Sequence, residues 1–467
     1  MTAERGKAKT AELFMTDPLN YFDRSYTKMH SLSPSDRSDL QLHALSARFA
    51  VQVHDIAMVG RLADRQGITS VERPEDIVPM LFEHTMYKSY PMALLERLDF
   101  ARLTTWLGKL TPVDVGNVNV DRCGSIQQWL GSLAADTDLD VGSSSGTTGT
   151  MSFFPWSKQE HVAKAELARV ARLQEFGKEP TQDQLTKPYH FVASNVGKYS
   201  RNYFAQAYTL GHSEMMHMRA ARVQDVDLLW LAARLRAAAA SGNADRVSVP
   251  DSLLSRRSEL EAFGVQSAEL DAVWLQEIES LSDVSTVWTI FPYDLYQIAS
   301  AGLSKGDFWK SGPGSVMVVT GGSKGRALPK DWLDTVKRFT DYRVVTGYGM
   351  TEASAVFLNC SAGRYHIPPW VIPFSLNPIT SELQPRHGVQ RGRFAFFDLM
   401  PVSHWGGLMS GDEVEIDFDG LCDCGATSQH IAPDVVRLSE ARGGDDKITC
   451  AATPEAHAQA MAFLTAY

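Results

Sequence analysis

The chain carries the run Ser144-Ser145-Gly146-Thr147-Thr148-Gly149, in which every residue is either a glycine or a hydroxyl residue. Glycines let another group approach the backbone closely, and serine and threonine hydroxyls donate hydrogen bonds that phosphate oxygens accept. Runs of this composition also occur as flexible linkers. We interpret this run as a loop that wraps the triphosphate of a nucleotide, and the other motifs of the chain decide between the two interpretations.

The residues after the run exclude the phosphate loop of P-loop NTPases. That loop ends in Gly-Lys-Ser/Thr and opens directly into a helix, whereas here Thr150-Met151-Ser152 follows. A capping box of Ser157 and Glu160 starts the next helix about two turns later, and we expect that helix to end near Gly177. Since Phe153-Phe154-Pro155-Trp156 suits a strand, the run is predicted to be the tip of a hairpin.

Three further segments place glycine or polar residues next to short apolar strands. Residues 342–345 run into Thr346-Gly347-Tyr348-Gly349-Met350-Thr351-Glu352, and residues 316–319 run into Thr320-Gly321-Gly322 and a helix expected from about residue 329 to 339. Gly411-Asp412 stands just before an alternating strand at 413–418 and the turn Asp419-Gly420. Turns at strand ends are where α/β proteins bind their ligands.

In this order, the four segments resemble the motifs of the adenylate-forming superfamily, which contains acyl-CoA synthetases, luciferases and peptide-synthetase adenylation domains. These enzymes use ATP to activate a carboxylic acid as an acyl-adenylate. The chain departs from the family pattern after the glycine-rich run, because Met151-Ser152 stands where the family has Pro-Lys. The family's loop lysine is therefore absent.

The resemblance implies a role for each motif residue. The phosphates of ATP would lie against Ser144, Ser145, Gly146, Thr147, Thr148 and Gly149, and the adenine against Gly321, Gly322, Tyr348 and Gly349, with Tyr348 stacked on the ring. Thr351 would touch the α-phosphate, Glu352 would hold Mg²⁺, and Asp412 would accept hydrogen bonds from the ribose hydroxyls. The ribose would also pair with an arginine, which is either Arg437, the one we favour, or Arg442.

Two segments narrow the resemblance. The first is Cys422-Asp423-Cys424-Gly425, which is similar to an insertion in the phenylacetate-CoA ligase branch and, more closely, to one in the acyl-protein synthetases of bacterial bioluminescence systems. The second is His84-Thr85-Met86-Tyr87-Lys88-Ser89-Tyr90-Pro91, which is similar to a segment of those acyl-protein synthetases. Acyl-protein synthetases carry the acyl group on a cysteine near the C-terminus before a partner reductase takes it. The resemblance gives this catalytic role to Cys450, whose pKa Lys447 would lower if the two are close. The alternative is that Cys450 is a small buried residue.

Two other groups of residues raise the question of a metal. A structural zinc site at Cys422 and Cys424 normally needs four ligands, and the further candidates are His430, Cys450 and His404. We expect a simple turn with reduced thiols there instead. Met215-Met216-His217-Met218 has helical spacing, so we expect it to lie in the core or in a pocket wall.

Composition and charge fit a large enzyme. The 467 residues are 44% hydrophobic, which is enough for a sizeable core. A net charge of -10 and a pI near 5.7 argue against nucleic acid or an anionic membrane as a partner. No stretch is apolar enough for a membrane span or a signal peptide, and five cysteines suit a reducing compartment, so we expect a cytoplasmic protein.

The fold class predicted is α/β, with four regions along the chain. Residues 1–135 are expected to be mainly helical, 136–355 to form an α/β nucleotide-binding region with strands at 190–193, 286–291, 316–319 and 343–345, 356–440 to form a β-rich lobe, and 441–467 to be a hinge-like tail. Alternation of strands with helices predicts parallel strands covered by helices. The resemblance implies the large body of an adenylate-forming enzyme, with the usual C-terminal lid missing or vestigial.

The lid matters because in the family its lysine neutralises charge during adenylation. Here the positive charge would come from Mg²⁺ at Glu352 and from an arginine or lysine elsewhere, or from a partner protein that supplies the lid. We expect ATP-dependent activation of a carboxylic acid, release of pyrophosphate, and transfer of the acyl group to a thiol of CoA or of a protein. The alternatives are an acyl-CoA ligase without the usual lid and a non-catalytic nucleotide-binding subunit of a partner enzyme.

Overall fold

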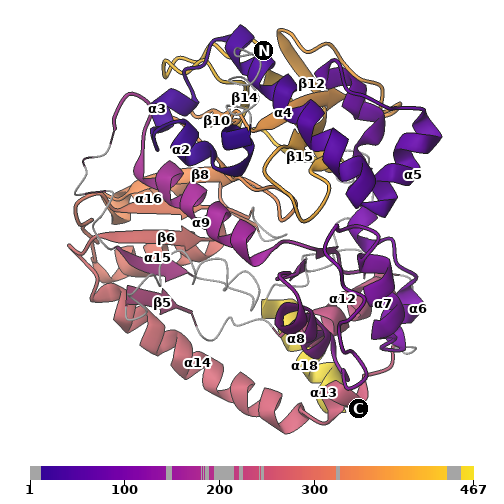
Figure 1. Ribbon diagram of the computed structural model, residues 1–467. Helices are drawn as coiled ribbons and strands as arrows, with labels where there is room; N and C mark the ends of the chain where they lie inside the picture. Colours follow the sequence, from indigo (N-terminus) through magenta and orange to yellow (C-terminus); the bar gives the residue numbers. More distant parts are fainter. Residues whose placement is uncertain are drawn as a thin grey trace.

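The computed structural model describes residues 12–143, 150–179, 181, 184, 189–193, 215–219, 225–240, 242, 247–321, 327–438 and 454–466. Its architecture is α/β, as predicted, with one mainly parallel sheet, one mainly antiparallel sheet and a separate pair of short strands (Figure 1). No helix within these ranges is both long enough and apolar enough to cross a membrane.

The N-terminal part is built from helices, as its spacing of apolar residues predicts. In order they are α2 (Pro18–Tyr21), α3 (Tyr26–Met29), α4 (Pro34–Asp55), α5 (Ala57–Gln66), the 3-10 helices η1 (Pro74–Met80) and η2 (Met86–Lys88), then α6 (Met92–Glu96), α7 (Phe100–Leu107) and α8 (Ile126–Asp136). A short strand, β1 (Phe82–Glu83), lies between η1 and η2. Side chains cap several of the starts: Ser33, for example, accepts a hydrogen bond from the Asp36 backbone N–H at the start of α4.

The parallel sheet has the strand order β5-β4-β6-β7-β8-β9, in which only β9 is antiparallel to its neighbour. Its strands are β4 (His190–Ala193), β5 (Met216–Met218), β6 (Thr286–Ile290), β7 (Val316–Val319), β8 (Arg343–Tyr348) and β9 (Phe357–Leu358). The four strands expected from apolar runs are present. The strand β5 corrects the helical interpretation of the methionine-rich segment, which pairs in register with β4.

Helices cover both faces of this sheet. They are α9 (Lys158–Leu173), α14 (Arg257–Glu279), α15 (Pro292–Lys305) and α16 (Trp332–Phe339). Two further helices, α12 (Val226–Ala240) and α13 (Asp251–Leu254), pack with one another in a separate cluster. Because successive strand residues face opposite sides, Met317 and Val319 pack with α14, α15 and α16, whereas Val316 and Val318 pack with the end of α9. The capping box of Ser157 and Glu160 is formed as predicted, but α9 ends at Leu173, well before Gly177.

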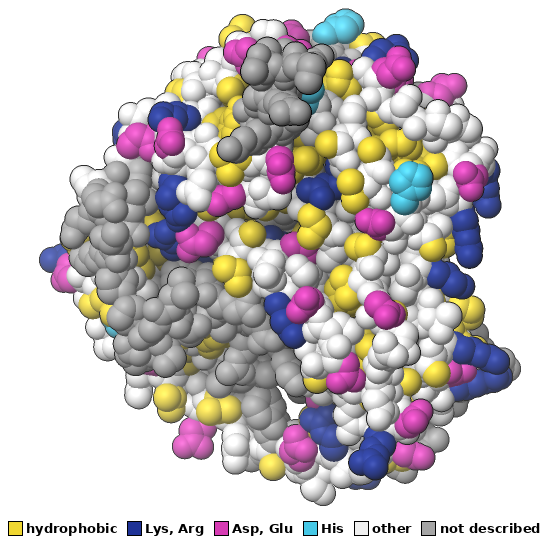
Figure 2. Space-filling model, viewed as in Figure 1, with side chains coloured by type: hydrophobic (Ala, Val, Ile, Leu, Met, Phe, Trp, Pro, Cys, Tyr) yellow, Lys and Arg dark blue, Asp and Glu magenta, His cyan; other side chains and the backbone are white. Residues whose placement is uncertain are grey.

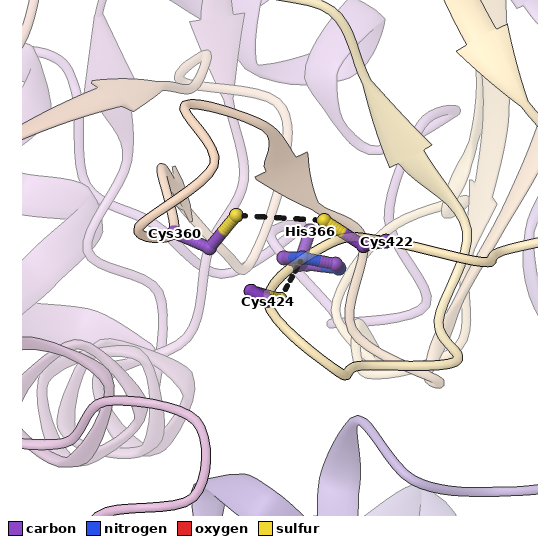
Figure 3. Close-up of side chains that lie close together, drawn as sticks. All are labelled: Cys360, His366, Cys422 and Cys424. Carbon is purple, nitrogen blue, oxygen red and sulfur yellow. Dashed lines mark hydrogen bonds between the residues drawn. The ribbon is translucent and has the colours of Figure 1, made fainter.

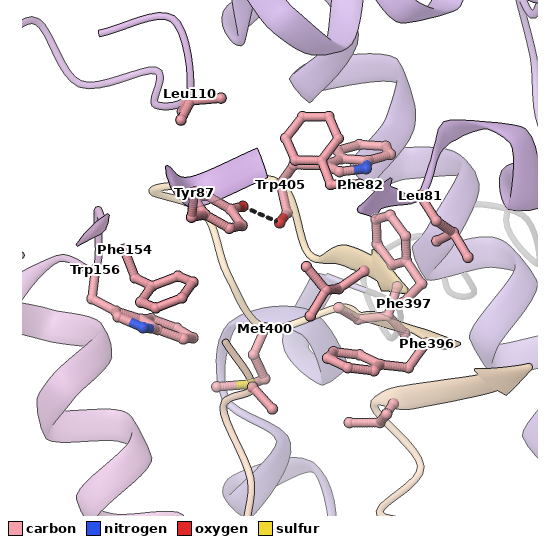
Figure 4. Packing of buried hydrophobic residues seen from close by; sticks show 14 of the residues in the cluster. Leu81, Phe82, Tyr87, Leu110, Phe154, Trp156, Phe396, Phe397, Met400 and Trp405 are labelled. Atoms are coloured by element: carbon pink, nitrogen blue, oxygen red, sulfur yellow. Dashed lines mark hydrogen bonds between the residues drawn. The ribbon is translucent and has the colours of Figure 1, made fainter. Parts of the chain in front are cut away.

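The second sheet is built mainly from the predicted β-rich region. Its order is β10 (Tyr365–His366), β14 (His430–Ile431), β13 (Gly407–Asp417), β12 (Val389–Asp398) and β11 (Val371–Leu376), and both β1 and β15 (Val436–Arg437) pair with β13. Fully buried aromatic residues of β12 and of the loop after it, among them Phe396, Phe397 and Trp405, pack with Phe82 and Tyr87 from the N-terminal part (Figure 4). The β-rich region and the N-terminal helices therefore share one core.

The last described helix, α18 (Pro454–Ala466), packs against α12 and α14. Ala456, Ala460 and Leu464 are fully buried there, next to Leu228 and Leu231 of α12. Figure 1 shows α18 beside α12, on the side of the molecule away from the antiparallel sheet. The four region boundaries expected from the sequence remain predictions.

Candidate functional site

The carboxyl end of β8 meets β13 at a cluster of three motif residues. Tyr348, the last residue of β8, donates its hydroxyl hydrogen to Asp412 Oδ2 at 2.8 Å. The Arg437 Nε atom lies 3.6 Å from Asp412 Oδ1, and the two residues are register partners between β13 and β15. Residues that are 64 and 25 positions apart from Asp412 in the chain thus meet at one carboxylate.

An irregularity in β13 directs Asp412. Arg393 pairs with Glu413 and Ala395 with Met409, so the three residues 410–412 lie opposite a single residue of β12. Such a bulge bends the strand and re-aims its side chains. The Asp412 backbone N–H is held by the Ser410 hydroxyl at 3.1 Å. The sequence interpretation placed Asp412 just before a strand; it lies instead inside β13, at the bulge.

Glycine at 347 is required by close packing. A Cβ atom there would lie 2.8 Å from Val356 Cγ1 and 2.9 Å from Thr320 Cγ2. Side chains do not reach such distances without movement of a neighbour. The glycine therefore allows the end of β7, β8 and the segment before β9 to meet, and it fixes where Tyr348 stands.

The turn after β8 carries Thr351 and Glu352, and two hydrogen bonds hold it. The Trp156 indole N–H donates to the Thr351 carbonyl at 3.0 Å, and the Ser354 backbone N–H donates to Asp398 Oδ2 at 2.6 Å. Since Trp156 follows β3 and Asp398 ends β12, the turn is fixed between the glycine-rich hairpin and the antiparallel sheet.

The strands that flank the glycine-rich run lie beside this turn. β2 (Gly142–Ser143) pairs antiparallel with β3 (Phe153–Phe154), so the predicted hairpin is present. A Cβ atom on Gly142 would lie 3.7 Å from Thr351 Cγ2. The run itself, residues 144–149, lies outside the described residues.

Opposing charges surround Glu352. Burial raises the pKa of this carboxyl above its usual value, Asp412 raises it further, and Arg437 and His84 lower it. The Lys164 ammonium on α9 lies 3.5 Å from the centre of the Trp156 ring. Burial lowers the Lys164 pKa to about 8, against the opposing effect of carboxylates that include Glu352. Lys164 is therefore a cation beside Trp156, the residue whose indole holds the turn that carries Thr351 and Glu352.

A second charged group lies behind the bulge. Arg393 Nη2 donates to Glu83 Oε2 at 2.6 Å and lies 3.3 Å from His84 Nδ1, while its Nε donates to the Ser410 carbonyl at 2.7 Å. Hydrogen bonding with His84, together with Arg393, lowers the pKa of Glu83 to about 2. The segment 82–84 thereby anchors the strand that carries Asp412.

Two other residues of the segment 84–91 support neighbouring parts of the backbone. The Tyr87 hydroxyl donates to the Trp405 carbonyl at 2.9 Å, which Figure 4 marks, and the Tyr90 hydroxyl donates to the Met151 carbonyl at 2.8 Å. Both tyrosines are buried. They support β3 and the loop that ends near Trp405 and do not reach Asp412 or Arg437 by any hydrogen bond among the described residues.

The structure therefore brings together Tyr348, Glu352, Asp412 and Arg437. Thr351 lies beside Gly142. Of the predicted glycines, Gly349 follows Tyr348 and Gly321 follows β7. Gly322, Arg442, Lys447 and Cys450 lie outside the described residues. Sequence reasoning missed Lys164, Asp398 and the Glu83–Arg393 pair. None of these carries a local motif; the only signal was that Lys164 lies in the first helix after the glycine-rich run.

A cavity of about 30 Å³ lies nearby, lined in part by Ala355, Val356, Leu167 and His366. It has room for roughly two water molecules. Figure 2 shows basic and acidic side chains interspersed over the visible face of the molecule.

No family model matches the sequence, and no curated protein matches it. Among solved structures, the chain is similar to an open conformation of 2-hydroxyisobutyryl-CoA ligase in complex with 2-HIB-AMP and CoA, with a TM-score of 0.51 and 12% identity over 88% of this chain and 77% of that one. A long-chain-fatty-acid-CoA ligase from Archaeoglobus fulgidus gives a TM-score of 0.35 at 10% identity over 65% of this chain and 52% of that one. ATP-bound MatB from Rhodopseudomonas palustris gives 0.33 at 14% identity over 63% and 48%. The first likeness shows that the chain shares the fold of 2-hydroxyisobutyryl-CoA ligase.

Proposed function

We propose that this protein activates a carboxylic acid with ATP, forms an acyl-adenylate, releases pyrophosphate and then transfers the acyl group to a thiol. The observation that carries the proposal is the meeting of Tyr348, Asp412 and Arg437 beside Glu352, at the carboxyl end of β8. The adenylate-forming fold supports it, because these four residues also match that superfamily's motifs in order.

Adenosine recognition is assigned to Tyr348 and Asp412. The Asp412 carboxylate accepts from Tyr348 at one oxygen and lies near Arg437 at the other. A carboxylate has about four acceptor positions, so ribose hydroxyls can donate to it as well. Tyr348 is held in place by aromatic neighbours, with ring centroids 5.9 Å from Phe394 and 6.1 Å from Phe357.

The first reaction step joins two anions. A carboxylate oxygen of the acid bonds to the α-phosphorus while the bond from that phosphorus to the bridging oxygen breaks, and pyrophosphate leaves with the electron pair. Fixed positive charge in a dry site lowers the barrier to such a step. We assign this task to Arg437, which interacts with Asp412 and Glu352, and to Lys164, which interacts with Glu352.

The residues present fit a magnesium ion at Glu352. Oxygen ligands from one or two carboxylates, together with phosphate oxygens, suit this ion. Burial and Asp412 both disfavour the ionised form of Glu352, and a bound dication would favour it. The ion would neutralise phosphate charge when bound with ATP.

The second step forms a thioester. A thiolate attacks the carbonyl carbon of the acyl-adenylate, and AMP leaves. We propose an acyl-protein synthetase-like transfer with Cys450 as the first acceptor, on the resemblance given above; transfer directly to CoA is the second candidate. Intact-mass measurement after incubation with ATP and acid separates them, because an acyl adduct that persists in Cys450→Ser excludes Cys450 as the acceptor.

ATP–pyrophosphate exchange against a panel of aliphatic and aromatic acids tests the proposal. We expect exchange with at least one acid and its near loss in Asp412→Ala and Glu352→Gln. The matched controls are Asp334→Ala and Glu259→Gln, which change exposed helix residues whose side chains are 77% and 67% accessible. Nucleotide binding without exchange for any acid would instead favour a non-catalytic nucleotide-binding subunit, and unchanged exchange in both site variants would overturn the assignment of the site.

A further inference from the structure

Three cysteines and a histidine from two distant segments converge outside the proposed nucleotide site. Cys360 follows β9 and His366 lies in β10, whereas Cys422 and Cys424 lie in the loop after β13 (Figure 3). The Sγ atoms and one ring nitrogen lie within 4.8 Å of one another. The sequence analysis considered Cys422 and Cys424 with His430, Cys450 or His404 and expected a simple turn with reduced thiols; it did not include Cys360 or His366.

The spacing of these atoms is that of ligands around a single ion. With Zn–S bonds of about 2.3 Å and a Zn–N bond of about 2.0–2.1 Å, a tetrahedral site has edges of about 3.8 Å between sulfurs and about 3.6 Å between sulfur and nitrogen. The structure has 3.7 Å between the Cys360 and Cys422 Sγ atoms and 3.2 Å between Cys424 Sγ and His366 Nε2. The set closes around an ion with side-chain shifts of about 1 Å or less.

The surroundings orient the ligands. His366 Nδ1 forms a hydrogen bond of 2.8 Å with the Ser428 hydroxyl, so that its Nε2 faces Cys424. Metal-bound histidines commonly hold their second ring nitrogen in this way. Gly425 has a φ of 95°, which only glycine adopts without strain, and its backbone N–H donates to the Cys422 carbonyl at 2.8 Å. The tight turn thereby presents both cysteines of the Cys-x-Cys-Gly segment to the same point.

We propose that Cys360, His366, Cys422 and Cys424 bind one zinc ion in a structural site. Three thiolates and one imidazole fill all four positions of a tetrahedral ion, which leaves none for a substrate or water. An iron–sulfur cluster fits less well, because its thiolates bind different iron atoms and lie farther apart than ligands of one ion.

The ion would join the β9–β10 connection to the loop after β13. Tyr365, next to His366, has its ring centroid 6.4 Å from that of Tyr348 and donates its hydroxyl hydrogen to Thr346 Oγ1 at 3.3 Å. The zinc site thus supports the strand that carries Tyr348 without belonging to the proposed chemistry. Its existence does not depend on the proposed function.

Metal analysis of the full-length protein, purified under reducing conditions, tests the inference. We expect close to one zinc per chain that survives a brief exposure to a weak chelator. Replacement by Co²⁺ should give the visible bands of a tetrahedral ion and near-ultraviolet charge transfer from thiolates. X-ray absorption of the zinc form should fit three sulfurs at about 2.3 Å and one nitrogen at about 2.0–2.1 Å.

Variants assign the ligands. Cys360→Ser and His366→Ala should lose zinc and melt at a lower temperature. The control is Cys123→Ser, which changes a cysteine outside the cluster that is hydrogen-bonded to Ser132; it should keep its zinc and its melting temperature. If the ligand variants fail to fold, the wild-type measurements still decide. A wild-type protein that takes up no zinc under reducing conditions, or one in which mass spectrometry finds a Cys360–Cys422 disulfide instead, would overturn the proposal.

Discussion

Asp412 is the residue to which ribose recognition is assigned in the proposed function. If its carboxylate accepts from the ribose, Asp412→Asn should weaken ATP binding by about 1.5–3 kcal/mol, roughly 10- to 100-fold, because a charge-assisted hydrogen bond is lost. The sharper expectation is one of selectivity: the wild-type protein should prefer ATP to 3′-deoxy-ATP, and this preference should be smaller in Asp412→Asn, whose amide oxygen accepts the hydrogen bond without a charge. Isothermal titration with both nucleotides measures this. An unchanged preference in the variant would show that another group reads the ribose.

Lys164 gives the proposed activity an alkaline limit. Its pKa is lowered by burial to about 8, so the ammonium keeps its charge at pH 7 and loses it as the pH rises through about 8. Exchange should fall over that interval, and Lys164→Met should be weakly active with no such fall. Lys337→Met, at a 64% exposed side chain on α16, is the control. If Lys164→Met keeps full exchange and the same alkaline limb, the positive charge comes from another residue.

The same lysine has a predictable effect on stability. Between about pH 8 and 10.5, Lys164 is protonated in the unfolded chain but has lost its proton in the folded chain. The contribution of Lys164 to the free energy of unfolding therefore rises with pH over this interval. Lys164→Met removes the cost of burying this charge. We therefore expect denaturant unfolding to find the variant at least as stable as the wild type at pH 7, which separates a loss of charge in the site from a loss of folding.

Glu352 gives the proposed activity an acidic limit. Its pKa lies above the ordinary glutamate value of 4.5, first because of burial and then because of Asp412. The neutral form binds a cation poorly, so the affinity for Mg²⁺-ATP should fall as the pH drops through this raised pKa, at a higher pH than an exposed glutamate would allow. Glu352→Gln should abolish that pH dependence, as measured by titration between pH 5 and 8. Persistence of the dependence would assign the cation to a different carboxylate.

At the scale of elements, the end of β8 is positioned by packing. Gly347→Ala would place a Cβ 2.8 Å from Val356 Cγ1 and 2.9 Å from Thr320 Cγ2, which we expect to cost about 1–3 kcal/mol of stability and to lower exchange by displacing Tyr348. Gly131→Ala in α8 is the matched control, because a Cβ there meets no atom within 4 Å and alanine favours the helix. Chemical denaturation together with the exchange rate distinguishes the two; equal effects of both variants would exclude the packing argument.

The elements that the sequence predicted well are those with a clear local period. Residues 190–193 and 316–319 are apolar runs bounded by turns, and both are strands; the capping box at Ser157 likewise marks the start of α9. Met216–Met218 was predicted wrongly because methionine is a good helix former, and pairing with β4 overrides this local preference. The bulge at Asp412 has no sequence signal, since only the opposite strand reveals it.

For the whole molecule, the limit of prediction is the contact between distant segments. The motif residues at 348–352, 412 and 437 could be named from the sequence because a known pattern orders them. Lys164, Asp398 and Glu83 could not, because each enters through packing: α9 against the turn after β8, β12 behind it, and β1 beside β13. The Cys360–His366 half of the zinc set was missed for the same reason, as 62 residues separate Cys360 from Cys422.

The packing of α18 makes a prediction at this largest scale. Leu464 is fully buried with Leu228 and Leu231 of α12, and Arg257 of α14 donates to the Thr465 carbonyl at 2.5 Å. Leu464→Ala should therefore cost about 2–5 kcal/mol, whereas Gln459→Ala, at an exposed position of the same helix, should cost little. Thermal and denaturant unfolding measure both. Because α18 lies away from Asp412 and Tyr348, the folded Leu464→Ala protein should keep wild-type affinity for ATP at low temperature. A variant that is stable but no longer binds ATP would mean that α18 acts on the nucleotide site through the body of the protein, and that the site extends beyond the junction of the two sheets.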